Sequence, residues 1–339
     1  MKTRPTALIV VLMVGWLSGC GGDPGTPAAT PAPERPPGLR IAMIAKSAKN
    51  PVFLSARNGA DAAAQELAQK HGIPIEIVWM TPDDEDAQVQ AERIAQAVKE
   101  QASAILISCS DAGKVSGAID DAVNRGVPVM TFDSDAAGSK RFAFYGVDDE
   151  KLGETVMREL ATLLRKKGAV AVLAGSPDAP NLRRRADGVK KEAAVTPGIK
   201  IVGTFTHVET AKDGAEEVLR AQKAHPEIQG WAMVGGWPLF TPRLMDLDPA
   251  KVKIVAVDAL PAQLAYVEKG LAPVLLAQPT YMWGYVSVQR IIDKVHLKQD
   301  VPEIIPMDVV RVTKSNLGSW ARQLRTWGFT VPETYVKLP

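Results

Sequence analysis

From Leu39 onward the sequence repeats one theme: a short apolar run, a polar or glycine-containing turn, and then a stretch with helical periodicity. Continuous apolar runs are typical of strands buried on both faces, and their alternation with helices predicts parallel sheets covered by helices. The predicted strands are 40–45, 74–79, 103–108, 127–132, 169–174, 199–205, 229–234, 252–257, 273–277 and 308–312. The predicted helices are 53–70, 86–100, 112–124, 150–166, 183–195, 211–223, 260–269 and 280–294.

The number of strands suits two sheets better than one. A chain of 339 residues also exceeds what a single hydrophobic core usually serves. The predicted fold class is therefore α/β, with two Rossmann-like lobes that are each built on a parallel sheet.

The first residues have a different character. A basic start, MKTRP, precedes the apolar stretch ALIVVLMVGWL and the motif LSGC, which ends at Cys20. The apolar stretch is too short to span a bilayer comfortably, and its flanks are typical of a secretory signal peptide. Residues 1–19 are predicted to be that signal peptide, Cys20 the lipidated first residue of the mature chain, and residues 20–38 a flexible tether rich in glycine, proline and alanine. The alternative is an ordinary signal peptide with a chance cysteine.

The charge of the mature chain excludes one class of partner. Removal of the signal peptide takes away Lys2 and Arg4, which leaves 38 basic side chains against 38 acidic ones. A chain without a positive field is not expected to bind nucleic acid. Cys109 has no partner once Cys20 is lipidated, so it is expected to be a buried, inert thiol.

Polar and aromatic residues follow many of the predicted strands, at the sheet edge where parallel sheets hold their ligands. Helix capping explains some of them, and Asp111 and Asp135 are interpreted as caps. A set that contains cations, amides, carboxylates and aromatic rings exceeds what capping explains. The candidate ligand-binding residues are Lys46, Asn50, Phe53, Asp133, Ser134, Arg183, Glu209, Trp237, Asp258 and Gln278.

The chemistry of this set favours binding over catalysis. The sequence contains no nucleophile elbow, Walker loop, zinc-protease motif or dinucleotide fingerprint, and its four histidines lack metal-ligand spacing. Neither a cofactor nor a metal is expected. Carboxylates accept hydrogen bonds from hydroxyls, lysine and arginine donate to sugar oxygens, and aromatic rings cover the apolar faces of a sugar. A core role for Phe53 and a solvated turn position for Lys46 remain equally open.

In their order and spacing, these motifs resemble those of the type I periplasmic sugar-binding proteins of the ribose- and arabinose-binding type. The resemblance extends from Leu39 to about Lys314 and is carried by KSAKNPVF, VPVMTFDS, NLRRRADGV, KIVAVDA and LLAQPTYMWGY. It implies sugar contacts by Lys46 and the Asn-Pro-aromatic turn at residues 50–53. It also implies sugar contacts by Asp133 with its neighbour Ser134, Arg183, Asp258 and Gln278. Arg184 and Arg185 are interpreted as a solvated basic face.

Three positions depart from the pattern of that family. Val52 stands where many relatives have the first of two stacking aromatic residues. Gly235 falls where an asparagine or aspartate often binds, and Trp237 is expected to fill the space beside it. Glu209 lies where several relatives have an aromatic residue or an aspartate. The pocket is therefore not expected to be a plain ribose site.

The resemblance also implies an organisation and a set of partners. Lobe one would comprise residues 39–147 plus 279–307 and lobe two residues 148–278 plus 309–339, joined by three crossings that form a hinge. Such a protein would be an extracytoplasmic monomer, held to the membrane by its lipid anchor alone, that delivers a small sugar to an ABC permease. The alternative is a receptor for a sugar-like, nucleoside or quorum signal that reports to a histidine kinase or chemoreceptor. An enzyme that turns over a bound sugar is not favoured.

Overall fold

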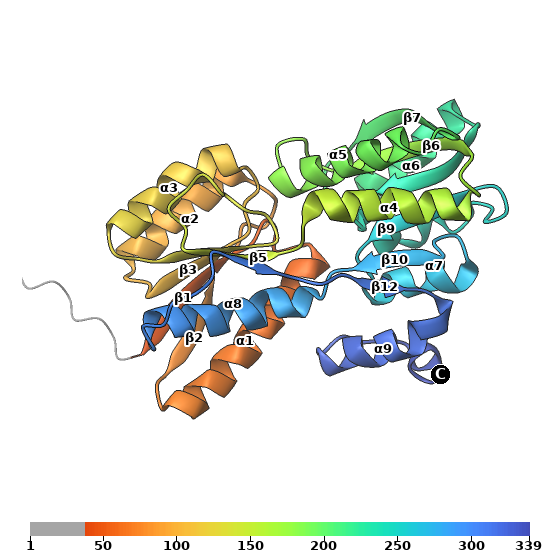
Figure 1. Ribbon diagram of the computed structural model, residues 1–339. Coiled ribbons are helices and arrows are strands. Elements are labelled where there is room, and N and C mark those ends of the chain that lie inside the picture. Colours follow the sequence, from red (N-terminus) through yellow and green to blue (C-terminus); the bar gives the residue numbers. More distant parts are fainter. Residues whose placement is uncertain (1–37) are drawn as a thin grey trace, which may run out of the picture. The chain divides into compact units, whose positions relative to one another are not determined.

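The computed structural model describes residues 38–339, which are organised around two six-stranded sheets (Figure 1). The first sheet has the strand order β11-β5-β4-β3-β1-β2 and is parallel throughout. The second has the order β12-β10-β9-β8-β6-β7 and is parallel except for β12, which runs antiparallel to β10. The predicted α/β class with two lobes is confirmed. The predicted signal peptide, Cys20 and the tether as far as residue 37 lie outside the described residues.

The part built on the first sheet is called lobe one, and the part built on the second sheet lobe two. The strands of lobe one are β1 (Leu39–Ile44), β2 (Ile75–Trp79), β3 (Ala104–Ile107), β4 (Val129–Phe132), β5 (Ala143–Gly146) and β11 (Ile304–Pro306). Those of lobe two are β6 (Gly168–Ala174), β7 (Ile199–Thr206), β8 (Ile228–Met233), β9 (Lys253–Val257), β10 (Val274–Ala277) and β12 (Val310–Val312). The helices are α1 (Pro51–His71), α2 (Ala87–Lys99), α3 (Ala112–Asn124), α4 (Asp149–Leu163), α5 (Pro180–Ala194), α6 (Ala211–Ala224), α7 (Leu264–Lys269), α8 (Thr280–Val295), α9 (Leu317–Thr326) and α10 (Glu333–Val336).

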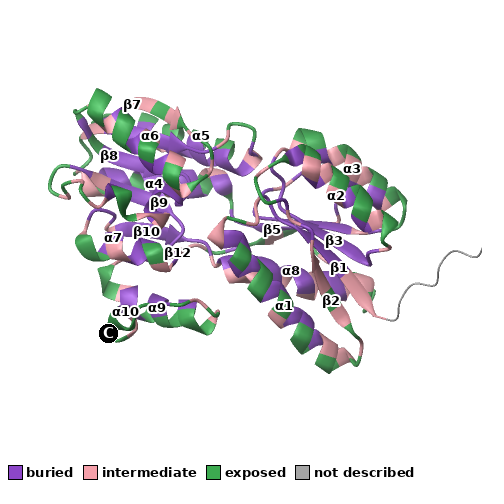
Figure 2. Ribbon diagram, turned by 180° about the vertical axis from the view of Figure 1, so that it is seen from behind, coloured by how far each residue is buried: buried purple, intermediate pink, exposed green. Residues whose placement is uncertain are grey.

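The central strand β1 shows why its residues form a continuous apolar run. Ala42 and Ile44 pack in one core with residues of α2 and α3, whereas Ile41 and Met43 pack in another with residues of α1 and α8. In Figure 1, α2 and α3 lie on one side of the first sheet and α1 and α8 on the other. Both faces of the strand are therefore buried, and Figure 2 shows the central strands buried beneath helices whose outer faces are exposed.

Some elements were not predicted from the sequence. β5 and β11 contain four and three residues, and β11 is largely exposed, so no long apolar run marks them. The helix α9 carries a recognisable signal, because its buried residues Leu317, Trp320, Ala321 and Leu324 follow helical spacing. No helix within residues 38–339 has both the length and the apolar character needed to cross a membrane.

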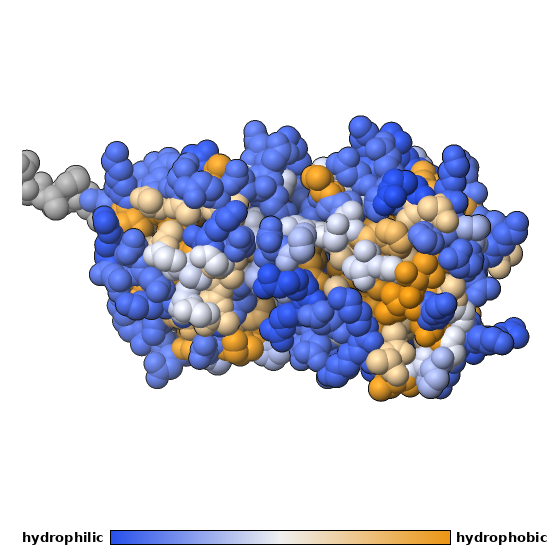
Figure 3. Space-filling model, turned by 90° about the horizontal axis from the view of Figure 1, so that it is seen from above, coloured by the Kyte–Doolittle hydropathy of each residue, from blue (hydrophilic) through white to orange (hydrophobic). Residues whose placement is uncertain are grey.

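The surface is largely hydrophilic, and the single described cysteine fits the sequence-based expectation. Hydrophilic residues cover most of the face shown in Figure 3, and the hydrophobic ones gather in separate patches. Cys109 is free and buried, as predicted, and its burial raises the pKa of the thiol above its usual value. A thiol in this state is a poor nucleophile.

Two glycines bring the backbones of α4 and α5 into contact. Gly153 on α4 lies against the carbonyl oxygen of Arg185, and Gly188 on α5 lies against that of Glu150. A side-chain carbon at either glycine would collide with the facing oxygen. The close approach positions the first turns of α5, which carry Asn181 and Arg185 into the site between the lobes.

We expect Gly188→Ala to lower the melting temperature, because the added carbon must push α5 away from α4. Overpacking of this kind costs about 1–3 kcal/mol, and about 1 kcal/mol corresponds to roughly 2–4 °C in domains of about 150–250 residues. Gly117 in α3 has open space around it, so the control Gly117→Ala should stabilise the protein slightly. Scanning calorimetry measures both variants, and equal effects would contradict the packing argument.

Candidate ligand site between the two lobes

Strand ends from both sheets meet around a small cavity of about 30 Å³. Such a volume holds about two water molecules and is far smaller than a sugar ring, so the lobes are closed upon each other. The predicted residues that line it are Lys46, Asn50, Phe53, Asp133, Glu209, Trp237, Asp258 and Gln278. Residues that were not predicted complete the lining: Val52, Asn181, Leu182, Arg185, Gly235 and Trp283.

Lys46 links the two lobes. It is 2% exposed, and its Nζ donates a hydrogen bond to Oδ1 of Asn181, in lobe two, at 3.2 Å. The same Nζ lies 3.7 Å from Oε1 of Glu85. Burial alone would lower the pKa of Lys46, but Glu85, Glu209 and Asp133 outweigh it and hold that pKa above its usual value. Lys46 is therefore a buried cation of the cleft and not a solvated turn charge.

The arginine in the cleft is Arg185, whose side chain is nearly inaccessible to water. Its Nε donates to Oδ1 of Asp149 at 2.8 Å, its Nη2 to Oε1 of Gln278 at 3.0 Å and its Nη1 to the carbonyl of Val234 at 3.2 Å. The guanidinium also lies 3.7 Å from Oδ1 of Asp133, in lobe one. Arg185 thus joins carboxylates from both lobes.

The prediction that Arg183 points into the cleft and Arg185 into solvent is wrong. The sequence placed the start of this helix at residue 183, whereas α5 begins at Pro180. A step of two residues turns an α-helix by about 200°, so the side chains at 183 and 185 leave the helix on opposite sides. Arg183 is exposed and donates to the carbonyl of Pro177 at 3.3 Å. Asn181, which lies one turn before Arg185, shares its buried face.

Asp133 and Asp258 occupy equivalent positions at the ends of β4 and β9. Both adopt a left-handed backbone, with φ of 57° and 71°, which costs an L-residue about 1–2 kcal/mol. Ser108 Oγ donates to Oδ2 of Asp133 at 2.8 Å, and Asn181 Nδ2 donates to its Oδ1 at 3.2 Å. Gln278 Nε2 donates to Oδ1 of Asp258 at 3.1 Å. Backbone strain at two facing carboxylates indicates that their positions serve the site.

Aromatic rings form the apolar walls of the cavity. Phe53 stacks on Trp283 with ring centroids 6.0 Å apart and meets Phe132 edge-on at 6.4 Å, so it belongs to the core and to the cavity wall at once. Trp237 fills the space beside Gly235, as expected, because a Cβ at Gly235 would collide with the indole. Trp283, on α8, was missed because the sequence pattern marked strand ends and not helix faces.

Four other polar residues that the sequence singled out have varied roles. Asn50 lines the cavity, and its side chain also caps α1. Ser134 is buried but does not line the cavity, and its Oγ has no hydrogen-bond partner within residues 38–339. Asp111 caps α3, as predicted. Asp135 is not a helix cap; it pairs with the buried Arg141 at 2.6 Å.

Burial raises the pKa of three carboxyls around the site. The pKa of Glu85 is raised to about 7 and those of Asp149 and Asp258 to about 6, since burial disfavours their charged forms more than the neighbouring Lys46 and Arg185 favour them. Glu85 comes from the loop after β2 and was not predicted. Within the described part of the chain, no group of three or more histidine, cysteine or acidic side chains is placed to hold a metal ion.

The chain has two α/β lobes whose strand ends face each other around a polar site with aromatic walls. This arrangement defines the class of two-lobed solute-binding proteins. The chain belongs to the family described by the periplasmic binding protein domain, which matches residues 41–297. This family consists of binding proteins and not enzymes, which confirms the expectation of binding over catalysis.

Individual relatives agree with this assignment. The chain is 23% identical to the ribose import binding protein RbsB of Bacillus subtilis over 297 residues, which cover 87% of this chain and 94% of the relative. A solute-binding protein of an ABC transporter from Burkholderia graminis, solved in complex with D-arabinose, is 26% identical, with a TM-score of 0.76 over 82% of this chain and 96% of that one. The arabinose-binding protein AraP from Geobacillus stearothermophilus is 25% identical, with a TM-score of 0.68 over 83% and 98%. The resemblance to type I periplasmic sugar-binding proteins is confirmed.

We expect Asp258→Gly to be more stable than Asp258→Ala, the reverse of the usual order. Both variants remove the same carboxylate, but only glycine adopts φ of 71° without strain. The difference in the free energy of unfolding should be about 1 kcal/mol in favour of glycine, measured by urea denaturation. At the exposed Asp178, which is not among the residues with positive φ, the control pair should show alanine as the more stable. If glycine and alanine had the same order of stability at positions 258 and 178, the backbone strain at Asp258 would be refuted.

The stability of the protein is expected to fall as the pH rises from about 4 to 7. Glu85, Asp149 and Asp258 have folded pKa values of about 7, 6 and 6 against ordinary values of 4.5, 3.8 and 3.8. The folded state therefore binds more protons than the unfolded state in this window, so stability is full below the ordinary values and is lost as the pH passes the folded ones. In denaturation at several pH values, Glu85→Gln should flatten the decline between about pH 4.5 and 7. A variant that follows the native curve in parallel would contradict the assignment.

Proposed function

We propose that this protein captures a small sugar between its lobes, outside the cytoplasm, and delivers it to an ABC importer. The cleft carries the proposal, because carboxylates, amides and cations from both lobes surround one cavity beside the rings of Phe53, Trp237 and Trp283. These are the groups that bind hydroxyls and cover sugar faces. The relatives support the same function, since one is named for ribose import and another was solved with D-arabinose. They favour import over a receptor that reports to a histidine kinase or chemoreceptor.

The bonds between the lobes explain how a sugar would favour closure. Lys46 bonds Asn181, and Asn181 bonds Asp133, across the cleft. A sugar whose hydroxyls take over these partners is held by both lobes, and it stabilises the closed form by the difference between its affinities for the closed and open forms.

We further propose that the moving units are the predicted lobes, residues 39–147 plus 279–307 and residues 148–278 plus 309–339. The pairing of β11 with β5 and of β12 with β10 supports this division, because each late strand returns to its own sheet. The three crossings near Asp148, Gln278 and Asp308 would then act as the hinge.

A panel of pentoses and hexoses tests the function directly. Thermal unfolding should shift upward with the correct sugar, because a ligand that binds only the folded state raises the melting temperature. Small-angle scattering should show that this sugar increases the closed population, as a smaller radius of gyration. If nucleosides stabilise the protein and no sugar does, the assigned class of ligand is wrong.

We expect Arg185→Lys to weaken sugar binding by roughly tenfold to a hundredfold. The bonds to Asp149, Gln278 and the backbone fix the position of the guanidinium. A lysine keeps the charge but cannot present its donors to the sugar from that position, and a hydrogen bond to a charged group contributes about 1.5–3 kcal/mol. Arg183→Lys, on the exposed side of the same helix, is the matched control and should change affinity less than about twofold. Calorimetric titration measures both. Equal losses would mean that the arginines act through general charge and not through position.

We also propose that Cys20 carries the lipid anchor of a monomeric protein, on the support of the basic start, the apolar stretch and LSGC. Mass spectrometry of the membrane fraction should find acylated Cys20 at the mature N-terminus. Cys20→Ala should release the protein from the membrane without changing its affinity for sugar, since the described residues that line the inner cavity lie between Lys46 and Trp283. An unmodified N-terminus at another residue would refute the lipid anchor. Sedimentation velocity measures the oligomeric state, which is expected to be a monomer.

A further inference from the structure

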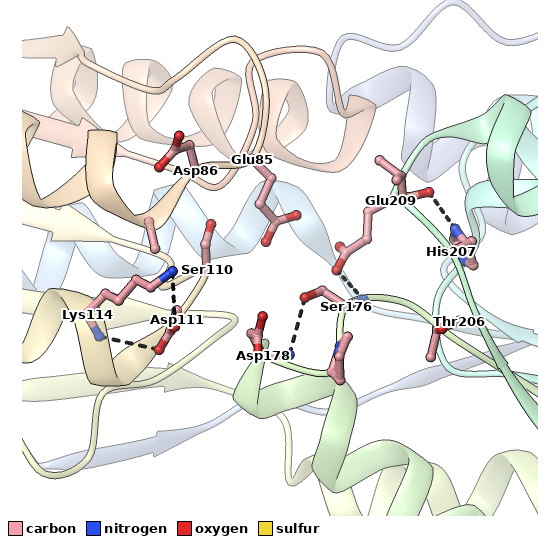
Figure 4. Close-up of a pocket in the computed structure, with 13 residues that line it drawn as sticks. Glu85, Asp86, Ser110, Asp111, Lys114, Ser176, Asp178, Thr206, His207 and Glu209 are labelled. Atoms are coloured by element: carbon pink, nitrogen blue, oxygen red, sulfur yellow. Dashed lines mark hydrogen bonds and ion pairs between the residues drawn. The ribbon is translucent and has the colours of Figure 1, made fainter.

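A second, larger cavity of about 640 Å³ lies at the mouth of the cleft, between the lobes (Figure 4). Lobe one contributes Glu85 and Ser110 to its lining, and lobe two contributes Ser176 and Glu209. Glu209 also lines the small inner cavity, so the two spaces adjoin at its side chain. A ligand seated in the cleft can therefore extend outward along Glu209.

The closed cleft contains more acidic side chains than buried cations. The buried cations are Lys46, which lies near Glu85, and Arg185, which pairs with Asp149. The carboxylates that face these two cations are more numerous: Glu85, Glu209, Asp133, Asp149 and Asp258. Further out, the lysine of the outer lining, Lys114, is paired with Asp111 at 3.9 Å. The closed cleft thus holds five carboxyl groups against two cations, and the pKa of Glu85, raised to about 7, leaves that group partly protonated at neutral pH.

Unpartnered polar atoms face the same boundary. Ser110 is 6% exposed, and its Oγ makes no hydrogen bond of normal geometry within residues 38–339. Oε1 of Glu85 is also buried and makes no hydrogen bond in this part of the chain; its contact is the ion pair with Lys46 at 3.7 Å. Figure 4 shows the Ser110 hydroxyl pointing toward Glu85, and the Glu85 and Glu209 carboxyl groups extending toward each other from opposite lobes. A group that donates several hydrogen bonds would satisfy the Ser110 and Glu85 oxygens and would also reach Glu209, whose Oε1 already accepts from the amide of Ser176.

We propose that the ligand carries a protonated amine, attached to its hydroxyl-bearing part, that binds between Glu85 and Glu209. This inference rests on the proposed sugar-binding function and narrows its substrate class to amino sugars or aminated polyols. An ammonium group donates three hydrogen bonds, which matches the two carboxylates and the Ser110 oxygen. Its charge also offsets the repulsion between two carboxylates that closure brings together, whereas a neutral hydroxyl does not.

Calorimetric titration of the full chain at neutral pH tests whether a ligand amine increases affinity, by comparing sugars that differ only in that group. The probes are D-glucose, D-galactose and D-mannose, their 2-amino-2-deoxy forms and the N-acetyl derivatives of those forms, together with neutral pentoses. At least one amino sugar should bind ten- to a hundredfold more tightly than its neutral parent. Its N-acetyl derivative, which keeps the nitrogen but loses the charge, should bind no better than the parent.

Variants assign the effect to the two carboxylates. Glu85→Gln and Glu209→Gln should each lower the preference for the amino sugar over its neutral parent, measured as the ratio of the two dissociation constants, at least tenfold. Asp178→Asn, which removes an exposed carboxylate from the same outer cavity, is the matched control and should change neither. Melting curves of each variant check that it is folded.

The outcomes separate this inference from the proposed function. A neutral sugar that binds more tightly than every amino sugar overturns the inference and leaves sugar binding in place. An amino sugar that binds best but is insensitive to both glutamate variants also overturns it, because the amine then lies elsewhere. Failure of every sugar, neutral or aminated, to bind overturns the proposed function and the inference together.

Discussion

The closed structure depends on how two buried cations share the carboxylates that meet between the lobes. Lys46 follows β1 and Arg185 lies on α5, so the two cations come from different lobes, and each is almost inaccessible to water. A buried ion without partners costs several kcal/mol. Arg185 keeps Asp149 and Gln278 beside it within lobe two, whereas the hydrogen bond from Lys46 crosses to Asn181. On the proposed function, separation of the lobes would cost Arg185 only its longer contact with Asp133, at 3.7 Å. Lys46 would lose its hydrogen bond to Asn181 and keep Glu85 beside it.

The hydrogen bonds that cross the cleft indicate how much free energy a ligand must add to close the lobes. The hydrogen bonds that cross the cleft, from Lys46 to Asn181 and from Asn181 to Asp133, each involve a charged group. Such bonds contribute about 1.5–3 kcal/mol each after exchange with water. The ordering of side chains and the removal of the buried charges from water both oppose closure by these contacts. A sugar that replaces these bonds with a larger set of its own shifts the balance decisively. Hydrogen bonds from Ser108 and Gln278 help to hold Asp133 and Asp258 in their strained backbone conformation, so these carboxylates are in place for that exchange.

The sequence predicted the parts of the site that lie directly on strand ends, because a buried parallel strand has a recognisable apolar run and its end is well defined. Lys46, Asp133 and Asp258 were found in this way. Which side chains of a helix face the site depends on the residue at which the helix begins. An error of a few residues in the start of α5 assigned the cleft position to the exposed Arg183 in place of the buried Arg185. Glu85 lies in a loop whose path no periodic pattern describes, so three-dimensional packing alone brings it to the cleft.

Because of Gly235 and Trp237, the polar group of lobe two on this side lies toward the mouth of the cleft and not beside the inner cavity at the end of β8. A polar side chain at position 235 would reach the cavity from the end of β8, but the glycine provides none, and the indole of Trp237 occupies that space. Glu209, which accepts a hydrogen bond from the amide of Ser176 at 3.0 Å, lies beside this wall, since its Oε1 and Trp237 both approach Gly175. Lobe two therefore presents an apolar surface on this side of the inner cavity and a strong acceptor at the entrance, opposite Glu85 of lobe one. On the proposed function, a sugar in this cleft places a ring face against Trp237 and directs its polar substituents toward the mouth.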